Sequence, residues 1–154
     1  MEGVTFSLER YNCICLDTAP LIYFIEENQR YISIVEKIFY EIYYGNIFGI
    51  SSYLTLLEVL IKPIKEGARE IADKYRDLLL GNLRMFPVDA RVAEKAAELR
   101  AKYDGNGFKL NTPDAIQVAT GLLNGAEIFL TNDRNLKQIQ EIEVIVLDEI
   151  TTQE

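Results

Sequence analysis

The sequence predicts an α/β protein in which a parallel sheet of about five strands is covered by helices on both faces. Short apolar runs alternate along the chain with longer segments whose apolar residues recur every three or four positions. Strands that are buried on both faces of a parallel sheet have this uninterrupted apolar character. The length of 154 residues suits one hydrophobic core, so we expect a single domain over residues 1–154.

The first half of the chain predicts two strands and three helices after a leader, residues 1–11, that shows no clear periodicity. We expect the strands at 13–16 and 47–50, and the helices at 18–25, 31–43 and 53–61. Thr18 is the expected N-cap of the first helix, and Ser51 or Ser52 that of the third. Pro63 should end the third helix.

The second half continues the alternation. We expect helices at 65–80, 89–103 and 112–123, a short helix after Asp133, and strands at 84–88, 127–130 and 144–147. Thr112 should cap the helix at 112–123, with Pro113 at its first position. The Gly-rich segment 104–107 is interpreted as a turn, and the acidic tail 148–154 should fray.

Four acidic residues stand at positions that predict a common site. Three lie next to predicted strands or at the start of a helix, and one lies within an apolar helical segment. Asp17 follows the first strand, Asp133 follows the fourth, and Asp114 lies in the first turn of the helix that leads into the fourth. Ligands of open α/β sheets bind outside the carboxyl ends of the strands. Glu58 is the only charge in a helical segment with apolar residues around it, where an ionised carboxylate is costly unless it is paired or binds metal. We therefore expect the four acids to converge.

Each acid also has a purely structural interpretation. Asp17 and Asp133 could cap the helices that follow them, and Asp114 suits the first turn of any helix because of the helix dipole. Glu58, which we place on one face with Leu54, Leu57 and Ile61, could pair with Lys62 four residues later. The sequence leaves these alternatives open.

The composition narrows the chemistry. The chain has no histidine, which excludes Ser-His-Asp and Cys-His catalysis and histidine zinc sites. A metal held by oxygen ligands would be a hard cation such as Mg²⁺, Mn²⁺ or Ca²⁺. The net charge of −8 argues against a general phosphate-binding surface and is compatible with a basic protein partner. Cys13 and Cys15 are interpreted as small apolar residues, because the chain lacks the Cys-x-x-Cys spacing of a redox pair.

Neither a signal peptide nor an apolar run of the roughly 20 residues that span a bilayer is present, so a cytoplasmic location is expected.

Four segments in this order resemble a PIN domain, in particular the VapC-type toxin ribonucleases. They are Leu16-Asp17-Thr18, the helix of Glu58, Asn111-Thr112-Pro113-Asp114-Ala115 and Thr131-Asn132-Asp133, and the likeness extends from about Cys13 to Leu147. The resemblance implies a three-layer α/β/α sandwich with strand order 3-2-1-4-5. It also implies that Asp17, Glu58, Asp114 and Asp133 hold Mg²⁺ or Mn²⁺ for the hydrolysis of RNA phosphodiester bonds, with Thr18, Thr131 and Asn132 supporting them.

The same resemblance suggests partners. It implies the toxin of a type II toxin–antitoxin pair with a basic antitoxin, and a homodimer to which the Tyr-rich helix 31–44 contributes. Lys102, Lys109, Arg134 and Lys137 flank the acids in sequence and are the candidate RNA contacts, although ordinary solvated charges would look the same. The alternatives are a catalytically silent PIN-like binding subunit and a PIN nuclease of RNA processing without an antitoxin.

Overall fold

A five-stranded parallel sheet forms the centre of the protein, as seen in a computed structural model that describes residues 4–5, 7–105 and 107–151. Its strands are β2 (Cys13–Leu16), β3 (Phe48–Ser52), β4 (Arg84–Phe86), β7 (Ile128–Thr131) and β8 (Glu143–Val146). All neighbours run parallel in the order β4-β3-β2-β7-β8. When only the strands of this sheet are numbered, the order is the expected 3-2-1-4-5. The chain adds strands on one side of β2 first and then on the other side, beginning with β7.

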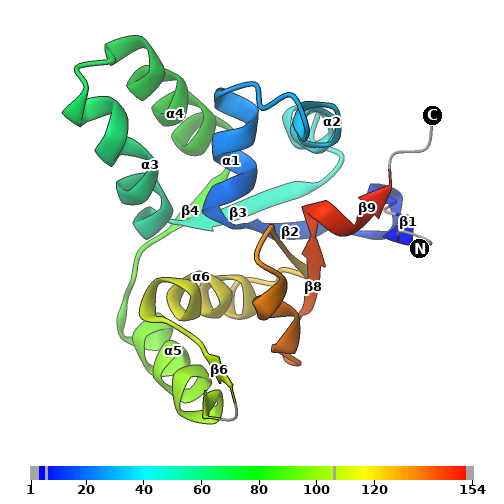
Figure 1. Cartoon of the computed structure of the whole chain (residues 1–154), viewed down its shortest axis with the longest axis vertical. Coiled ribbons are helices and arrows are strands. Elements are labelled where there is room, and N and C mark those ends of the chain that lie inside the picture. The colour runs from blue at the N-terminus through cyan, green and yellow to red at the C-terminus, as the bar shows by residue number, and fades with distance from the viewer. Residues whose placement is uncertain (1–3, 6, 106, 152–154) are drawn as a thin grey trace.

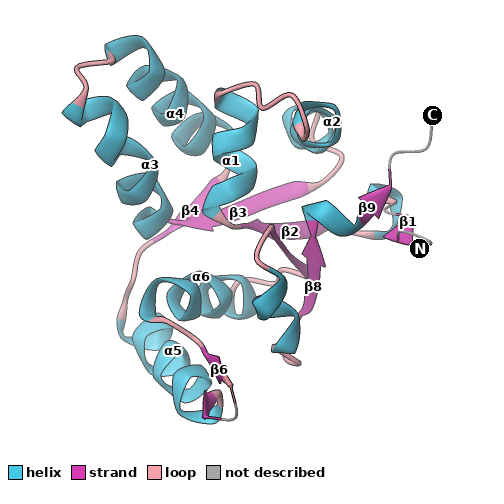
Figure 2. Cartoon of the chain, viewed as in Figure 1, coloured by secondary structure: helices cyan, strands magenta, loops and turns pink. Residues whose placement is uncertain are grey.

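Helices cover both faces of the sheet, which confirms the three-layer architecture (Figure 1). One face carries α1 (Thr18–Ile25), α2 (Ile32–Tyr43), α3 (Tyr53–Lys65) and α4 (Arg69–Asn82). The other carries α5 (Ala90–Lys102) and α6 (Thr112–Leu123), which are joined by the short antiparallel strands β5 (Asp104–Gly105) and β6 (Phe108–Lys109). Figure 2 shows the strands between these two sets of helices.

Side chains of β2 alternate between two cores, as the pleat of a strand requires. Ile14 and Leu16 pack in the core beneath α1 and α2, whereas Cys15 packs in the core beneath α5 and α6. Cys13 contacts the same core as Cys15, and neither cysteine forms a disulfide. Burial raises the pKa of the Cys15 thiol far above its usual range. Both residues therefore act as the small apolar residues that we expected.

Helix α6 lies directly against β2. A Cβ atom on Gly121 would stand 2.9 Å from Cβ of Cys15, so only glycine permits this approach. The Cys15 thiol also donates a hydrogen bond to the main-chain carbonyl of Gln117 at 3.5 Å. These contacts fix α6 relative to the strand that ends at Asp17.

The boundary between α3 and α4 differs from the expected one. The prediction that Pro63 ends the third helix is wrong, because α3 continues through Pro63 to Lys65. Pro63 lies in the last turn, where the missing N–H removes only one helical hydrogen bond, and its ring is buried. The next helix begins at Arg69 rather than Lys65, after Gly67 takes a φ of 67°.

The two ends of the chain pair with each other. Strand β1 (Val4–Thr5) runs parallel to β9 (Ile150–Thr151). The short helix η1 (Leu8–Arg10) follows β1, and the short helix η3 (Leu147–Glu149) precedes β9. Figure 1 shows β1 and β9 side by side. The expectation that the tail frays is therefore wrong for residues 148–151, and the leader, which shows no periodicity in the sequence, contains β1 and η1. Residues 1–3, 6 and 152–154 lie outside the described part of the chain.

Within the described ranges, every helix is too short or too polar to cross a bilayer.

Candidate acidic site

Asp17 lies where β2 ends and is the N-cap residue of α1. Its Oδ1 accepts a hydrogen bond from the Thr18 amide at 2.8 Å, and its Oδ2 accepts one from the Thr131 hydroxyl at 2.6 Å. The prediction that Thr18 caps this helix is wrong, because the carboxylate before it reaches the first amide of the helix. Burial raises the pKa of Asp17, and the hydrogen bonds from Thr131 and Thr18 oppose that rise.

Glu58 of α3 approaches Asp17 through Thr18. Its Oε2 accepts a hydrogen bond from the Thr18 hydroxyl at 3.4 Å, while its Oε1 is buried and has no hydrogen-bond partner among the described residues. Lys62, the alternative partner of Glu58, instead lies 3.8 Å from Glu26. Burial raises the pKa of Glu58, and the charge of Asp17 raises it further.

The face that we assigned to Glu58 needs correction. Leu57 and Ile61 are 56% and 57% exposed, so the stripe that they form with Glu58 is not a buried face. The buried residues of α3 are Thr55, Val59 and Pro63. Because α3 is apolar nearly all round, its periodicity alone did not distinguish the two faces.

Asp114 lies in the first turn of α6, as expected, but a different residue caps the helix. The N-cap is Asn111, not Thr112, and its Oδ1 accepts a hydrogen bond from the Asp114 amide at 2.9 Å. Burial raises the pKa of the Asp114 carboxyl to about 6, and the charges of Asp17, Asp133 and Glu58 add to the rise. The negative charges of all three other acids therefore act on the Asp114 carboxyl.

Asp133 follows β7 and is exposed to solvent. It caps the short helix η2 (Arg134–Gln138), with its Oδ1 accepting a hydrogen bond from the Asn135 amide at 3.0 Å. Its own amide donates to the Thr131 hydroxyl at 3.1 Å. Asp133 therefore does cap a helix, which was its structural interpretation. Its charge also raises the pKa of Asp17 and of Asp114.

These four residues, which we call the acidic cluster, meet at the edge of the sheet where β2 and β7 end. Charges within the cluster add to burial in raising the pKa values of Asp17, Glu58 and Asp114, so a bound cation would relieve this repulsion. All are oxygen donors, and the buried Oε1 of Glu58 lacks a partner among the described residues, which suits a hard cation. Among the described side chains, however, no group of three or more acids or cysteines is already placed to hold a metal ion.

A buried amide beside the cluster was missed from the sequence. The Nε2 of Gln117 donates hydrogen bonds to the hydroxyls of Thr18 at 3.1 Å and Thr55 at 3.0 Å. Gln117 lies three residues after Asp114 in α6, and residues at this spacing share a helix face. A polar residue at that position within an apolar run was the signal that would have revealed it.

Two of the three expected supporting residues contact the acids. Thr18 and Thr131 form hydrogen bonds to Glu58 and Asp17, as described above. Asn132 does not: its Nδ2 donates to the hydroxyls of Tyr23 and Tyr31, both at 3.0 Å, and its Oδ1 accepts from the amide of Asp148 at 3.0 Å. Asn132 therefore connects the C-terminal segment to α1 and α2.

The candidate RNA contacts divide into two pairs. Lys102 lies 2.5 Å from a carboxylate oxygen of Glu141, and Lys137 pairs with Glu149. Lys109 and Arg134 are exposed and form no salt bridge within the part of the chain that the structure describes. The latter two are thus the more available cations.

One cation near Asp114 was not anticipated. Arg100 of α5 donates from Nε to the carbonyl of Leu110 at 3.1 Å and from Nη1 to the hydroxyl of Thr112 at 2.8 Å. These bonds hold the guanidinium at the start of α6, two residues before Asp114.

A cavity of about 160 Å³ opens beside Glu58 between α1, α3 and α4. Three acids line it, namely Glu26, Glu58 and Glu66, together with Lys62 and apolar residues that include Ile22 and Tyr75. The cavity therefore has apolar walls and a mostly acidic rim.

Comparison with known proteins places this geometry in context. The family model of the PIN domain matches residues 14–142, and no curated protein matches the chain. VapBC2 from Rickettsia felis, in a structure bound to a DNA fragment from its promoter, is similar with a TM-score of 0.70 and 18% identity over 87% of this chain and 98% of that one.

Two further structures show the same fold at low identity. A toxin–antitoxin complex from Klebsiella pneumoniae is similar with a TM-score of 0.65 and 22% identity over 89% of this chain and 99% of that one. VapC20 from Mycobacterium tuberculosis, described as a toxin that cleaves the sarcin-ricin loop, is similar with a TM-score of 0.59 and 16% identity over 75% of this chain and 86% of that one.

Proposed function

This chain belongs to the PIN domain family, and we propose that it is a Mg²⁺- or Mn²⁺-dependent endoribonuclease, the toxin of a type II toxin–antitoxin pair. The observation that carries the proposal is the convergence of Asp17, Glu58, Asp114 and Asp133 at one edge of the sheet, where burial and the charges of the other three acids raise the pKa of Asp114 to about 6. Carboxylates that repel one another at the carboxyl edge of a parallel sheet are suited to bind a divalent cation.

We assign the metal ligands to the acidic cluster. A divalent cation bound there supplies an activated water and neutralises charge on the leaving oxygen during phosphodiester hydrolysis. The chain's own groups prepare the site: the Thr131 hydroxyl stabilises ionised Asp17, and the Thr18 hydroxyl orients Glu58. No histidine base is required, in agreement with its absence from the sequence.

The distribution of charged side chains suggests where RNA and a protein partner bind. Lys109, Arg134 and Arg100 are the proposed contacts to the RNA backbone, because Lys102 and Lys137 are already paired with glutamates. The acidic rim of the cavity beside Glu58 suits a basic antitoxin segment. The similar structures from R. felis and K. pneumoniae are toxin–antitoxin complexes, which supports a protein partner of this kind.

The test is cleavage of a structured RNA by the purified chain with and without Mn²⁺, using Asp114→Asn as the matched control. We expect cleavage that EDTA and the substitution each abolish. Metal-independent cleavage would contradict the proposal.

A catalytically silent binding subunit is the second candidate. It is favoured by the lack, among described side chains, of a group of three acids already arranged around a metal position. A folded protein that binds no Mn²⁺ in calorimetry would support this alternative.

A further inference from the structure

A buried chain of hydrogen bonds links three helices beside the acidic cluster. Gln117 of α6 is only 2% exposed, and its amide nitrogen donates to the hydroxyls of Thr55 and Thr18 at 3.0 and 3.1 Å. The Thr18 hydroxyl in turn donates to Oε2 of Glu58 at 3.4 Å. The chain thus runs from α6 through the start of α1 to α3, and it ends on a carboxylate.

The orientation of the Gln117 amide determines where the Thr18 proton goes. Thr18 has a single hydroxyl proton, and because its oxygen accepts from Gln117, that proton remains for Glu58. With the amide turned round, Oε1 of Gln117 would face both hydroxyls and would compete with Glu58 for the proton.

The observed orientation pairs both amide donors of Gln117 and leaves only its acceptor unpaired within the described ranges. Oε1 of Gln117 is buried without a hydrogen-bond partner among the described residues, and an unsatisfied acceptor destabilises a protein. The opposite orientation would satisfy this oxygen at the two threonines, but it would place the two N–H donors of the amide where Oε1 now has no partner in the described part of the chain. The orientation that is present satisfies both donors and leaves the Thr18 proton for Glu58.

We propose that Gln117 is a positioning residue of the acidic cluster, which holds the Glu58 carboxylate in place through the Thr18 hydroxyl. The metal-binding role of Glu58 rests on the proposed function, whereas the hydrogen-bond chain does not. The Gln117 side chain makes no hydrogen bond to the four acids among the described residues. Its position three residues after Asp114 means that α6 supplies one acid directly and orients a second on α3.

The effect of such positioning is preorganisation. A glutamate side chain loses considerable rotamer freedom when it is held in one place, and groups behind a ligand carry part of that cost. The Oε2 atom is held by Thr18, and Oε1 remains without a partner among the described residues. Glu58 therefore presents one oxygen for a ligand while the other is fixed.

The decisive experiment is a double-mutant cycle. Gln117→Met removes both donors at nearly constant volume, and Thr18→Val cuts the chain at its middle while leaving the main-chain bond to Asp17 intact. We expect each variant to weaken Mn²⁺ binding about tenfold in calorimetry, and the double variant to bind no more weakly than either single one. Thr18→Ser, which retains the hydroxyl, should bind as the wild type does.

A matched control lies on the same helix. Thr120 is buried in α6, and its hydroxyl donates to the carbonyl of Ile116 at 2.7 Å. Thr120→Val should lower the melting temperature without changing Mn²⁺ affinity by more than about twofold. An equal loss of affinity in this control would show that Gln117 acts only through packing, and would overturn the proposal.

The same cycle without metal separates the two proposals. Non-additive shifts of melting temperature for Gln117→Met and Thr18→Val in EDTA would show that the bond exists in solution, and additive shifts would overturn the positioning role. Wild-type protein that binds no Mn²⁺ would overturn the proposed function, while this metal-free cycle would still decide on the hydrogen-bond chain. If Gln117→Met does not fold, Gln117→Leu takes its place in the cycle, and Thr18→Val compared with Thr18→Ser tests the bond to Glu58 separately.

Discussion

Thr131 donates a hydrogen bond of 2.6 Å to Asp17, and this bond joins the end of the central strand β2 to the end of its neighbour β7. The bond stabilises the ionised form of a carboxylate whose burial raises its pKa. Asp17 is therefore a buried acid that is kept ionisable by a neighbouring hydroxyl. This balance between burial and local hydrogen bonds should determine how the metal affinity and the stability of the protein depend on pH and on substitutions in the acidic cluster.

Removing one charge from the cluster should abolish function and spare the fold. We expect Asp17→Asn and Asp114→Asn each to eliminate Mn²⁺-dependent RNA cleavage. In EDTA, the melting temperature of each variant should equal or exceed that of the wild type, because one repulsive charge is gone. Cleavage assays and thermal unfolding on the same samples test both statements. Full activity in either variant would remove the proposed site.

Stability without metal should fall as the pH rises through the acidic range. The pKa of Asp114 is raised from 3.8 to about 6 in the folded protein, so between these values the folded state binds more protons than the unfolded state. The free energy of unfolding then decreases as pH increases from about 4 to about 6, and it levels off above that. The raised pKa values of Asp17 and Glu58 act in the same direction.

Urea unfolding in EDTA at several pH values measures this dependence. The slope should be smaller in Asp114→Asn, because that variant lacks the group with the raised pKa. Added Mn²⁺ should reverse the loss above pH 6, since the cation favours the ionised acids. A stability that rises across this range in EDTA would contradict the electrostatic description.

Glu58→Gln keeps the shape of the side chain and removes its charge. We expect it to lower Mn²⁺ affinity and RNA cleavage with little change in melting temperature, because its Oε2 contact with Thr18 can be retained by the amide oxygen. A role limited to a surface pair would cost well under about 1 kcal/mol and leave cleavage unchanged. The pairing of Lys62 with Glu26 makes Lys62→Gln a suitable control.

Much of the fold follows from local patterns, and the errors have identifiable causes. The apolar run at β2 and the alternation of elements predicted the sheet correctly, including the reversal beside β2. The caps at Thr18 and Thr112 were wrong because Asp17 and Asn111, one residue earlier in each case, reach the amides of the first turn. Such choices between adjacent capping residues depend on where the preceding strand or loop ends.

The site was less predictable than the fold. The convergence of Asp17 and Asp114 follows from topology. The polar Gln117 within an apolar run marked that position as unusual, but its bonds to Thr18 and Thr55 on two other helices depend on tertiary packing. The pairing of β1 with β9 joins residues at opposite ends of the chain, and neither segment has a strand-like apolar run. The face of α3 was misassigned because the exposed Leu57 and Ile61 have the helical spacing that is typical of buried residues.

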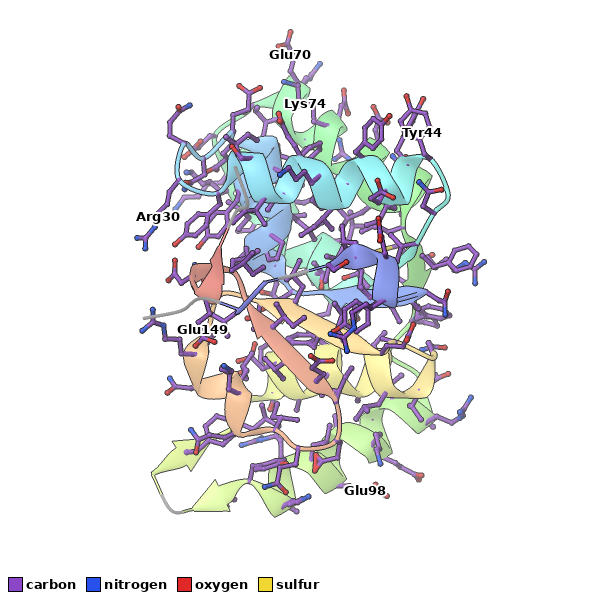
Figure 3. The ribbon with its side chains drawn as sticks, turned by 90° about the vertical axis from the view of Figure 1, so that its right-hand side faces the viewer. Arg30, Tyr44, Glu70, Lys74, Glu98 and Glu149 are labelled. Atoms are coloured by element: carbon purple, nitrogen blue, oxygen red, sulfur yellow. The ribbon has the colours of Figure 1, made fainter. Side chains whose placement is uncertain are left out.

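The exposed tyrosines at the end of α2 give a test of self-association. Tyr40, Tyr43 and Tyr44 are 57%, 71% and 59% exposed, and Tyr43 and Tyr44 contact edge to face at 5.1 Å. Figure 3 shows Tyr44 far from Arg30, which precedes the other end of this helix. The expected homodimer should therefore use only the C-terminal part of the segment 31–44, since Tyr31 is buried.

Sedimentation across micromolar concentrations tests this expectation. Tyr43→Ser should shift the equilibrium toward monomer, because truncating an exposed aromatic residue removes interface area without disturbing the core. The matched control is Ile61→Ser, which truncates an equally exposed apolar residue on α3. Dissociation by the control alone would place the interface on α3, and a monomeric wild type would contradict the dimer.

Adjacent residues Thr131 and Asn132 should have separable roles. Thr131→Val removes the hydrogen bond to Asp17 and should raise the pKa of that carboxyl further, so Mn²⁺ affinity should fall, more at pH 6 than at pH 8. Asn132→Ala removes the bonds to Tyr23, Tyr31 and the amide of Asp148 and should cost roughly 1–3 kcal/mol of unfolding free energy. It should leave metal affinity close to that of the wild type, because Asn132 makes no hydrogen bond to the acidic cluster among the described residues. Calorimetry with Mn²⁺ and urea unfolding on both variants measure the two effects, and a loss of metal affinity in Asn132→Ala equal to that in Thr131→Val would show that the C-terminal segment also positions the acids.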